Sequence, residues 1–351
     1  MVEFLNRYVS IQKESTYGTA PTSRGTGNGE RFGEVDDESL GTTYDLMTRQ
    51  DMSRPIAAKS VTGTERSEGD INLAVQVDDF VGNLLYSFFP QDDYDNSQDP
   101  IFRHTLTEPS LTSDSAGVYP SWAIRVGREE KEHTFAGMVT NSLSISASVG
   151  EYVMMSVGFV GQSEDAPAAL VTPTFDGAAL DALHFANGTV KFDDGTDAAP
   201  AATASIKSIS FDINLNRDTD NAYGIGSPTY GRAPPAQRRE ISGTIEFNKV
   251  LYGNQTLDEP DYTQLVASNG MEYSALTNIR PVMSLNFVDE SAADFIKFDF
   301  FKIRFEAPEA SVSGRDTNTM TVNFVALYDE TFGGAMRVTA QGTKLHNAQY
   351  D

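Results

Sequence analysis

The chain has 351 residues, of which 50 are Asp or Glu and 26 are Lys or Arg, so its formal net charge is −24 at pH 7. It contains no cysteine and four histidines, which excludes disulfides, thiolate metal sites and a cysteine nucleophile and leaves little room for imidazole chemistry. Such a negative charge disfavours sustained contact with nucleic-acid phosphates or anionic lipid. The excess of carboxylates and the scarcity of Lys predict a protein adapted to concentrated salt, from a halophilic source.

The N-terminal residues 1–18 contain no apolar run long enough for a signal peptide. No later stretch reaches about 18 uncharged apolar residues, so the sequence predicts no membrane span. We therefore expect a soluble protein that is made in the cytoplasm. Its length favours two domains over one.

Alternation of apolar and polar residues is the main pattern and predicts a mainly β protein. It is clearest in residues 206–216, where Ile209, Phe211, Ile213 and Leu215 alternate with Ser208, Ser210, Asp212 and Asn214. Such a strand has one face on a core and one in water. The same pattern predicts strands within residues 71–77, 143–149, 155–159, 241–247, 298–300 and 303–305, with a bulge at Phe300–Phe301.

Apolar residues at spacings of three and four predict a helix over Asp78–Phe88 and a weaker one over Asp261–Ser268. Two segments rich in Gly, Pro, Ser and charge, residues 19–38 and 224–239, read as long loops. Loops of this length are unusual in a compact domain, so we expect both to connect neighbouring subunits of an assembly and to become ordered only when they contact a neighbour.

The order of predicted strands recurs in the two halves of the chain, which indicates an internal duplication. Pairing Gly69 with Gly243, Ile124 with Leu285, and Phe159 with Phe324 gives offsets of 174, 161 and 165 residues. These offsets differ only by loop-sized insertions. The sequence thus predicts a first domain over residues 1–161, a linker over 162–181 and a second domain over 182–351.

Nothing in the sequence assembles a catalytic, cofactor-binding or metal site, so we expect a protein that is not an enzyme and has no cofactor. No two of the four histidines have a metal-ligand spacing. The turn at Asp193–Asp197 lacks the terminal Glu of a calcium loop and is predicted to be a hairpin turn. Other motif-like residues are interpreted as chance matches or surface loops: Gly224-Ile225-Gly226, the sequons at Asn187 and Asn254, and the histidines His104, His133, His184 and His346.

The N-terminal segment YVSIQKESTYGTAP, residues 8–21, resembles the start of the major tail tube proteins of long-tailed, siphovirus-like viruses. Residues 188–193, 206–216 and 239–247 are similar to the hairpin, long loop and returning strand of a tube domain. With the acidic, Lys-poor composition, this resemblance indicates a virus that infects a halophilic archaeon.

The resemblance implies two tandem tail tube domains of the β-sandwich or barrel-like type, each with a short flanking helix. It also implies a virion tail subunit, made in the host cytoplasm, whose rings stack into a passive conduit for genome delivery. Because rings of this family present six domains, a duplicated chain predicts a homotrimer with pseudo-sixfold symmetry, with a hexamer as the alternative. The expected partners are further copies of the chain, other tail proteins at the tube ends and DNA that passes without specific binding; no membrane is involved.

The lumen of such a tube should be negatively charged, because a conduit must not bind DNA. Asp212 and Asn214, opposite the apolar Phe211 and Ile213, are candidates for either the lumen or the outer surface. Two other classes stay open: a cell-surface or capsid-decoration module of the S-layer or adhesin type, and a β-scaffold enzyme that acts on glycosides with a pair of carboxylates.

Overall fold

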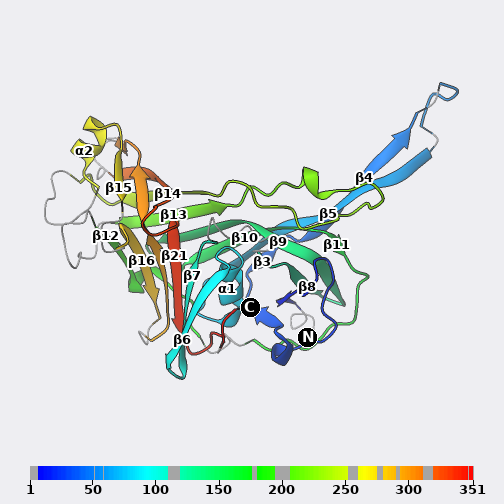
Figure 1. Cartoon of the computed structure of the whole chain (residues 1–351), viewed down its shortest axis with the longest axis horizontal. Helices are drawn as coiled ribbons and strands as arrows, with labels where there is room; N and C mark the ends of the chain where they lie inside the picture. Colours follow the sequence, from blue (N-terminus) through cyan, green and yellow to red (C-terminus); the bar gives the residue numbers. More distant parts are fainter. Residues whose placement is uncertain are drawn as a thin grey trace.

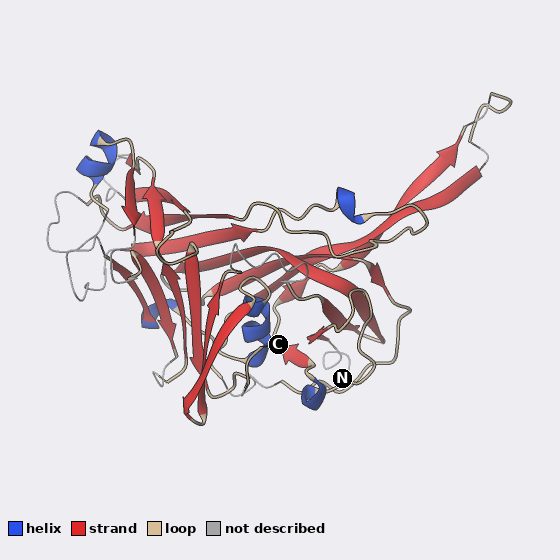
Figure 2. Cartoon of the chain, in the orientation of Figure 1, coloured by secondary structure: helices blue, strands red, loops and turns tan. Residues whose placement is uncertain are grey.

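The computed structural model describes residues 7–50, 52–57, 59–109, 119–175, 180–193, 206–251, 260–274, 280–289, 293–310, 319–346 and 348–350. Within them the chain is mainly β, as predicted (Figure 2). The first-half strands are β1 (Tyr8–Lys13), β2 (Arg31–Gly33), β3 (Asp37–Glu38), β4 (Gly41–Arg49), β5 (Lys59–Ala74), β6 (Gln91–Gln98), β7 (Ile101–Thr107), β8 (Trp122–Arg128), β9 (Lys131–Ser148), β10 (Met154–Gly161) and β11 (Ser163–Glu164). The second-half strands are β12 (Gly188–Phe192), β13 (Ile206–Asn214), β14 (Glu240–Phe247), β15 (Met271–Ser274), β16 (Met283–Val288), β17 (Phe295–Phe300), β18 (Lys302–Phe305), β19 (Glu309–Ala310), β20 (Met320–Ala326) and β21 (Met336–Gly342).

Two short α-helices follow equivalent strands, α1 (Asp79–Tyr86) after β5 and α2 (Tyr262–Ala267) after β14. Each begins at an Asp N-cap: the carboxylate of Asp78 accepts a hydrogen bond from the N–H of Val81, and that of Asp261 accepts from the N–H of Thr263 and Gln264. Both helices lie where the apolar spacing predicted them, so these two predictions are confirmed. The described residues also form three single-turn 3-10 helices: η1 (Thr26–Asn28), η2 (Phe185–Asn187) and η3 (Asp220–Ala222).

A long central sheet runs through both halves of the chain in the order β15-β18-β20-β14-β13-β9-β10-β5-β3, with β4 also paired to β5. Figure 1 shows it along the top of the molecule, with the remaining strands beneath it. A six-stranded sheet, β12-β16-β17-β21-β7-β6, lies under the second half. Under the first half, three strands pair in the order β2-β1-β8, and β8 pairs with the start of β9. Apolar side chains fill the space between the layers as one continuous core.

The strand β9 passes from the lower layer to the upper one. Its first residues pair with β8, and from Val139 onward it pairs with β10. Gly137 lies at this transition with a φ of +67°, a conformation that favours glycine. In the second half the chain makes the same transition at Phe301, between β17 in the lower sheet and β18 in the upper one. The bulge predicted at Phe300–Phe301 is therefore wrong, because the change of phase there reflects a change of sheet.

The two halves share one connectivity, which supports the predicted duplication. The upper strands β4-β5-β10-β9 correspond to β13-β14-β20-β18, and the lower strands β1-β8-β9-β11 correspond to β12-β16-β17-β21. The registers also agree. Phe159 lies opposite Gly69, and Phe324 lies opposite Gly243.

Both sheets cross the predicted boundary between the halves. In the upper layer β13 pairs with β9 over Ser208–Asn214, and in the lower layer β7 pairs with β21. The division into two domains at residues 162–181 stays a prediction. Strands from both halves pair in each layer, so the structure does not separate the halves at this boundary. Sequence patterns did not indicate the β6–β7 hairpin or the long hairpin of β4 and β5.

Candidate functional site

The upper face of the central sheet is polar, and no second sheet of the described strands covers it. Along β9 the buried Leu143 and Ile145 alternate with the half-buried serines at 142, 144, 146 and 148. The alternation predicted for β13 is confirmed, since Phe211 and Ile213 are buried in the core. Asp212 and Asn214, the two residues singled out from the sequence, are exposed on the polar face. The period of two in the sequence therefore produces a continuous polar surface.

Short hydroxyl and acidic side chains line up across this face. Ser144 on β9 lies opposite Ser156 on β10 on one side and Asp212 on β13 on the other, and Asp212 in turn lies opposite Ser242 on β14. The next row joins Met154, Ser146, Ser210, Thr244 and Asn323 in the same way. Such side chains present hydroxyl groups to water and offer no deep recess for a ligand.

Charge on this face is predominantly negative. Among the described outward positions of β10, β13, β14, β20 and the upper part of β9 there is no Lys or Arg, and on β5 Arg66, at the base of the arm-like hairpin with β4, pairs with Glu68 at 3.5 Å. Lys207 lies at a bulge of β13 and pairs with Glu246 at 2.8 Å. The carboxylates at outward positions are Glu68, Asp70, Asp212, Glu240 and Glu246. The face thus repels phosphate groups.

Both long loops pack on their own chain, so the expectation that they become ordered only against a neighbour is wrong. In residues 224–239, the carbonyl of Pro228 accepts a hydrogen bond from the N–H of Glu65 at 2.9 Å, and the carbonyl of Tyr230 accepts one from Gln162 Nε2 at 2.6 Å. Tyr230 is buried. Residues 19–38 contain η1, β2 and β3 and lie against β1 and β5.

A buried ion cluster holds the loop of residues 19–38. Arg24 contacts Glu30 at 2.6 Å and Glu132 at 2.7 Å, and Ser10 Oγ donates to Glu30 at 2.9 Å. Burial disfavours the charged form of Glu30, but hydrogen bonds from Arg24, the N–H of Gly25 and Ser10 outweigh it and lower the pKa of this carboxyl. Tyr8 donates to Glu132, and burial together with this hydrogen bond raises the pKa of Tyr8 to about 12.

The strands β4 and β5 form a hairpin that projects far from the rest of the molecule (Figure 1). We call residues 41–66 the arm. Its apolar side chains are exposed: Tyr44, Leu46, Met47 and Val61 on the strands, and Met52 and Ile56 near the tip. No pattern predicted the arm, because both of its faces are in solvent and its apolar residues do not alternate.

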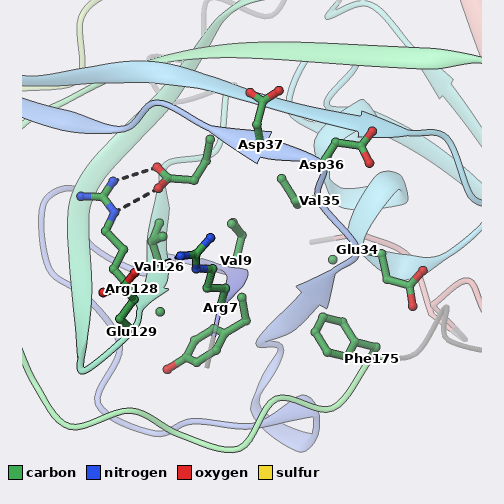
Figure 3. Close-up of a pocket in the computed structure, with 14 residues that line it drawn as sticks. Arg7, Val9, Glu34, Val35, Asp36, Asp37, Val126, Arg128, Glu129 and Phe175 are labelled. Atoms are coloured by element: carbon green, nitrogen blue, oxygen red, sulfur yellow. Dashed lines mark hydrogen bonds and ion pairs between the residues drawn. The ribbon is translucent and has the colours of Figure 1, made fainter. Parts of the chain in front are cut away.

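A cavity of about 640 Å³ opens between β1, β8 and the segment that joins β2 to β3 (Figure 3). Val35 and Phe175 are among its apolar lining residues. At its rim Arg128 pairs with Glu38 at 2.8 Å, and Arg7 pairs with Glu129 at 2.9 Å.

The four histidines take structural positions. His104 is fully buried, with Nδ1 at 2.9 Å from Asp92 and Nε2 at 2.8 Å from the carbonyl of His346. His133 lies 2.6 Å from Glu164, and His184 caps η2. Across the part of the chain that the structure describes, no three His, Asp or Glu side chains form a group that could hold a metal ion.

Two further sequence motifs can be placed only in part. Asn187 and Thr189 of the first sequon lie in η2 and β12, whereas the sequon at Asn254 lies outside the described residues. Of the turn at Asp193–Asp197, only Asp193 is described, and it pairs with Arg280 at 3.3 Å.

These features define a class: a two-layered, duplicated β protein whose notable surfaces are a broad polar sheet face and an apolar arm, as in a structural subunit of an assembly. The profile of a family described as phage tail tube protein matches residues 5–326, nearly the whole chain. The chain belongs to this family, which places it in the virion tail as a structural tube subunit. A comparison with curated proteins found no match. None of the described helices is long and apolar enough to cross a membrane.

Proposed function

We propose that this chain assembles into stacked rings that form the tail tube of a long-tailed virus, a passive conduit for genome delivery. The observation that carries the proposal is the polar, acidic face of a sheet that continues through both halves of the chain. In the ring this face lines the lumen. Its carboxylates and hydroxyl groups keep DNA hydrated and repel its phosphates, so the genome slides without being bound.

The junction between the halves provides a template for contacts between chains. Within the chain, β13 of the second half pairs with β9 of the first half. The strand that corresponds to β9 in the second half is β18. The strand that corresponds to β13 in the first half is β4, and it lies at the outer edge of that half. Joining β4 of one chain to the second-half edge of the next, where β15 lies outside β18, continues the sheet head-to-tail and closes a ring.

Three chains in such a ring supply six tube-like units, so the ring is a homotrimer with pseudo-sixfold symmetry. The duplicated connectivity supports this stoichiometry over a hexamer, because each chain already carries two copies of the four-stranded upper layer. We further propose that other tail proteins cap the two ends of the tube. The domain boundaries of the two units are those predicted, at residues 161 and 182.

The net charge of −24 supports a host that lives in concentrated salt, and we propose a halophilic archaeon. High ionic strength shortens the Debye length to about 3 Å at 1 M, which allows such acidic subunits to pack together. Carboxylates also hold water where salt would otherwise compete for it.

Negative-stain microscopy of the purified protein in molar salt tests the proposal. We expect tubes with an open lumen, and end-on views that show six densities per ring. Mass measurement of single rings should give three chains of 38.2 kDa each. A protein that stays monomeric, or a ring of six whole chains, would contradict the respective part of the proposal.

A further inference from the structure

The described part of the chain leaves the apolar side chains of the arm uncovered. Its exposed apolar side chains include Met52 at 106% and Ile56 at 79% of full exposure. A long, flat hairpin with apolar side chains in water pairs readily with other molecules, and proteins rarely keep one uncovered. Because the arm projects away from the body of the subunit (Figure 1), its tip is placed where another molecule can reach it.

The tip of the arm is basic in an otherwise acidic chain. Residues 46–61 contain Arg49, Arg54 and Lys59 and one acid, Asp51. None of these three cations lies within ion-pair distance of a carboxylate among the residues that the structure describes. A partner for the tip should therefore offer an apolar surface bordered by negative charge.

The cavity next to β2 and β3 has this character (Figure 3). Val35 and Phe175 are apolar, and the exposed Glu34, Asp36 and Asp37 form part of its border. No Lys, Arg or His among the described residues forms an ion pair with these three carboxylates. The two cations of the cavity, Arg7 and Arg128, already have Glu129 and Glu38 as partners.

We propose that the arm tip of one chain docks into this cavity of a second copy in the next ring. Met52 and Ile56 enter the space of about 640 Å³, while Arg49, Arg54 and Lys59 approach Glu34, Asp36 and Asp37. Donor and acceptor are different surfaces of the same chain, so the contact is head-to-tail and leaves a free arm and a free cavity at each end of a stack. The inference rests on the proposed ring and adds the element that joins rings into a tube.

Charge reversal on the arm tests the docking. The triple variant Arg49→Glu, Arg54→Glu, Lys59→Glu should form rings but lose tubes, with ring-to-ring association weakened at least about tenfold. A matched control reverses three exposed cations elsewhere, Arg232→Glu, Lys249→Glu and Lys344→Glu, and should keep its tubes. Sedimentation and negative-stain microscopy separate rings from tubes, and circular dichroism checks folding.

Restoration makes the test specific. Reversing the rim with Glu34→Lys, Asp36→Lys and Asp37→Lys should also abolish tubes, and combining the two triple variants in one chain should restore them. Arm-reversed protein that still forms tubes of normal length would overturn the docking while leaving the ring intact. Wild-type protein that forms no rings would overturn both proposals.

Cross-linking gives a second readout, since the natural chain has no cysteine. The double variant Met52→Cys, Val35→Cys should form a ladder of intermolecular disulfides in oxidised tubes. Ile225 is as exposed as Met52 but lies outside the arm, so Ile225→Cys with Val35→Cys should give no ladder. Equal ladders from both pairs would contradict the docking.

Discussion

Phe324 on β20 lies directly opposite Gly243 on β14, and its ring occupies the space that a side chain at position 243 would need. A Cβ atom there would lie 2.5 Å from Cζ of Phe324 and 2.4 Å from the carbonyl oxygen of Ser210. In the first half, Phe159 also lies opposite Gly69, but there a Cβ atom would instead meet the backbone of Ser39 and Leu40, with the carbonyl oxygen of Ser39 at 2.5 Å. The Gly–Phe pairing thus recurs in both halves of the central sheet, and at each glycine a Cβ atom would clash, although with different neighbours.

The variant Gly243→Ala should therefore lower the free energy of unfolding by about 1–3 kcal/mol, because the added methyl group overpacks a close contact. Denaturant unfolding of unassembled subunits measures this change. Gly224→Ala is the matched control, since a Cβ at 224 meets no atom within 4 Å. Equal stability of the two variants would show that the Phe324 ring moves aside without cost.

The ion cluster of Arg24, Glu30 and Glu132 gives a prediction for an uncharged substitution. Arg24→Met leaves the buried carboxylates of Glu30 and Glu132 with Arg125, 3.6 Å from Glu30, as their remaining cation. We therefore expect a loss near the lower end of about 3–5 kcal/mol in the free energy of unfolding. The double variant Arg24→Met, Glu30→Gln should recover part of it. A single variant as stable as the wild type would contradict the role of Arg24 in holding residues 19–38.

The lowered pKa of Glu30 predicts the sign of a pH effect. A carboxyl whose pKa is lower in the folded state than in the unfolded state stabilises the fold at pH values above the unfolded pKa, which for Glu is ordinarily 4.5. This stabilisation disappears as the pH falls through the folded-state pKa. From about pH 5 downward, the wild type should therefore lose more stability than Glu30→Gln. Parallel stability curves for the two proteins would contradict this assignment.

Much of the sheet could be predicted from the sequence, because a strand with one buried face must alternate. Residues 206–214 and 143–148 are clear cases, and the change of phase at Phe300–Phe301 marks the place where the chain changes sheets. The pairing of β13 with β9 could not be predicted in this way. Alternation specifies which face of a strand is buried, but it carries no information on which distant strand lies beside it.

The arm and the cavity were missed for a related physical reason. The arm buries neither face within its own chain, so no period of two appears between residues 41 and 66. The cavity draws its lining from β1, β8, residues 33–38 and Phe175, which are brought together only by the fold. The basic character of residues 46–61 within an acidic chain was the one signal available from the sequence.

Reversing the charge of the polar face should make the tube retain DNA. Asp212→Lys with Ser144→Lys places two cations side by side on neighbouring strands, three times around a trimeric ring. We expect tubes of this variant to bind a short DNA duplex in a filter-retention assay. The logarithm of the binding constant should fall with the logarithm of the salt concentration, with a slope of about 0.9 per phosphate contact.

The control for the lumen variant places the same charge change on the lower layer, with Glu130→Lys and Ser15→Lys at exposed positions. These tubes should bind much less DNA inside a lumen that stays acidic. Equal retention by both variants would show that the polar face does not line the lumen.

Lowering the salt concentration should dissolve the tubes. Dialysis from 1 M to about 0.05 M salt lengthens the Debye length from about 3 Å to about 14 Å, so repulsion extends between subunits that each carry −24 charges. The same change strengthens the ion pairs proposed between the arm and the cavity, but these involve three cations per chain, whereas repulsion sums over the whole acidic surface. Turbidity and microscopy during dialysis measure the outcome, and replacing the salt with sucrose at equal osmolality separates screening from osmotic effects. Tubes that survive at low salt would show that local contacts outweigh the net charge and would remove the argument for a halophilic host.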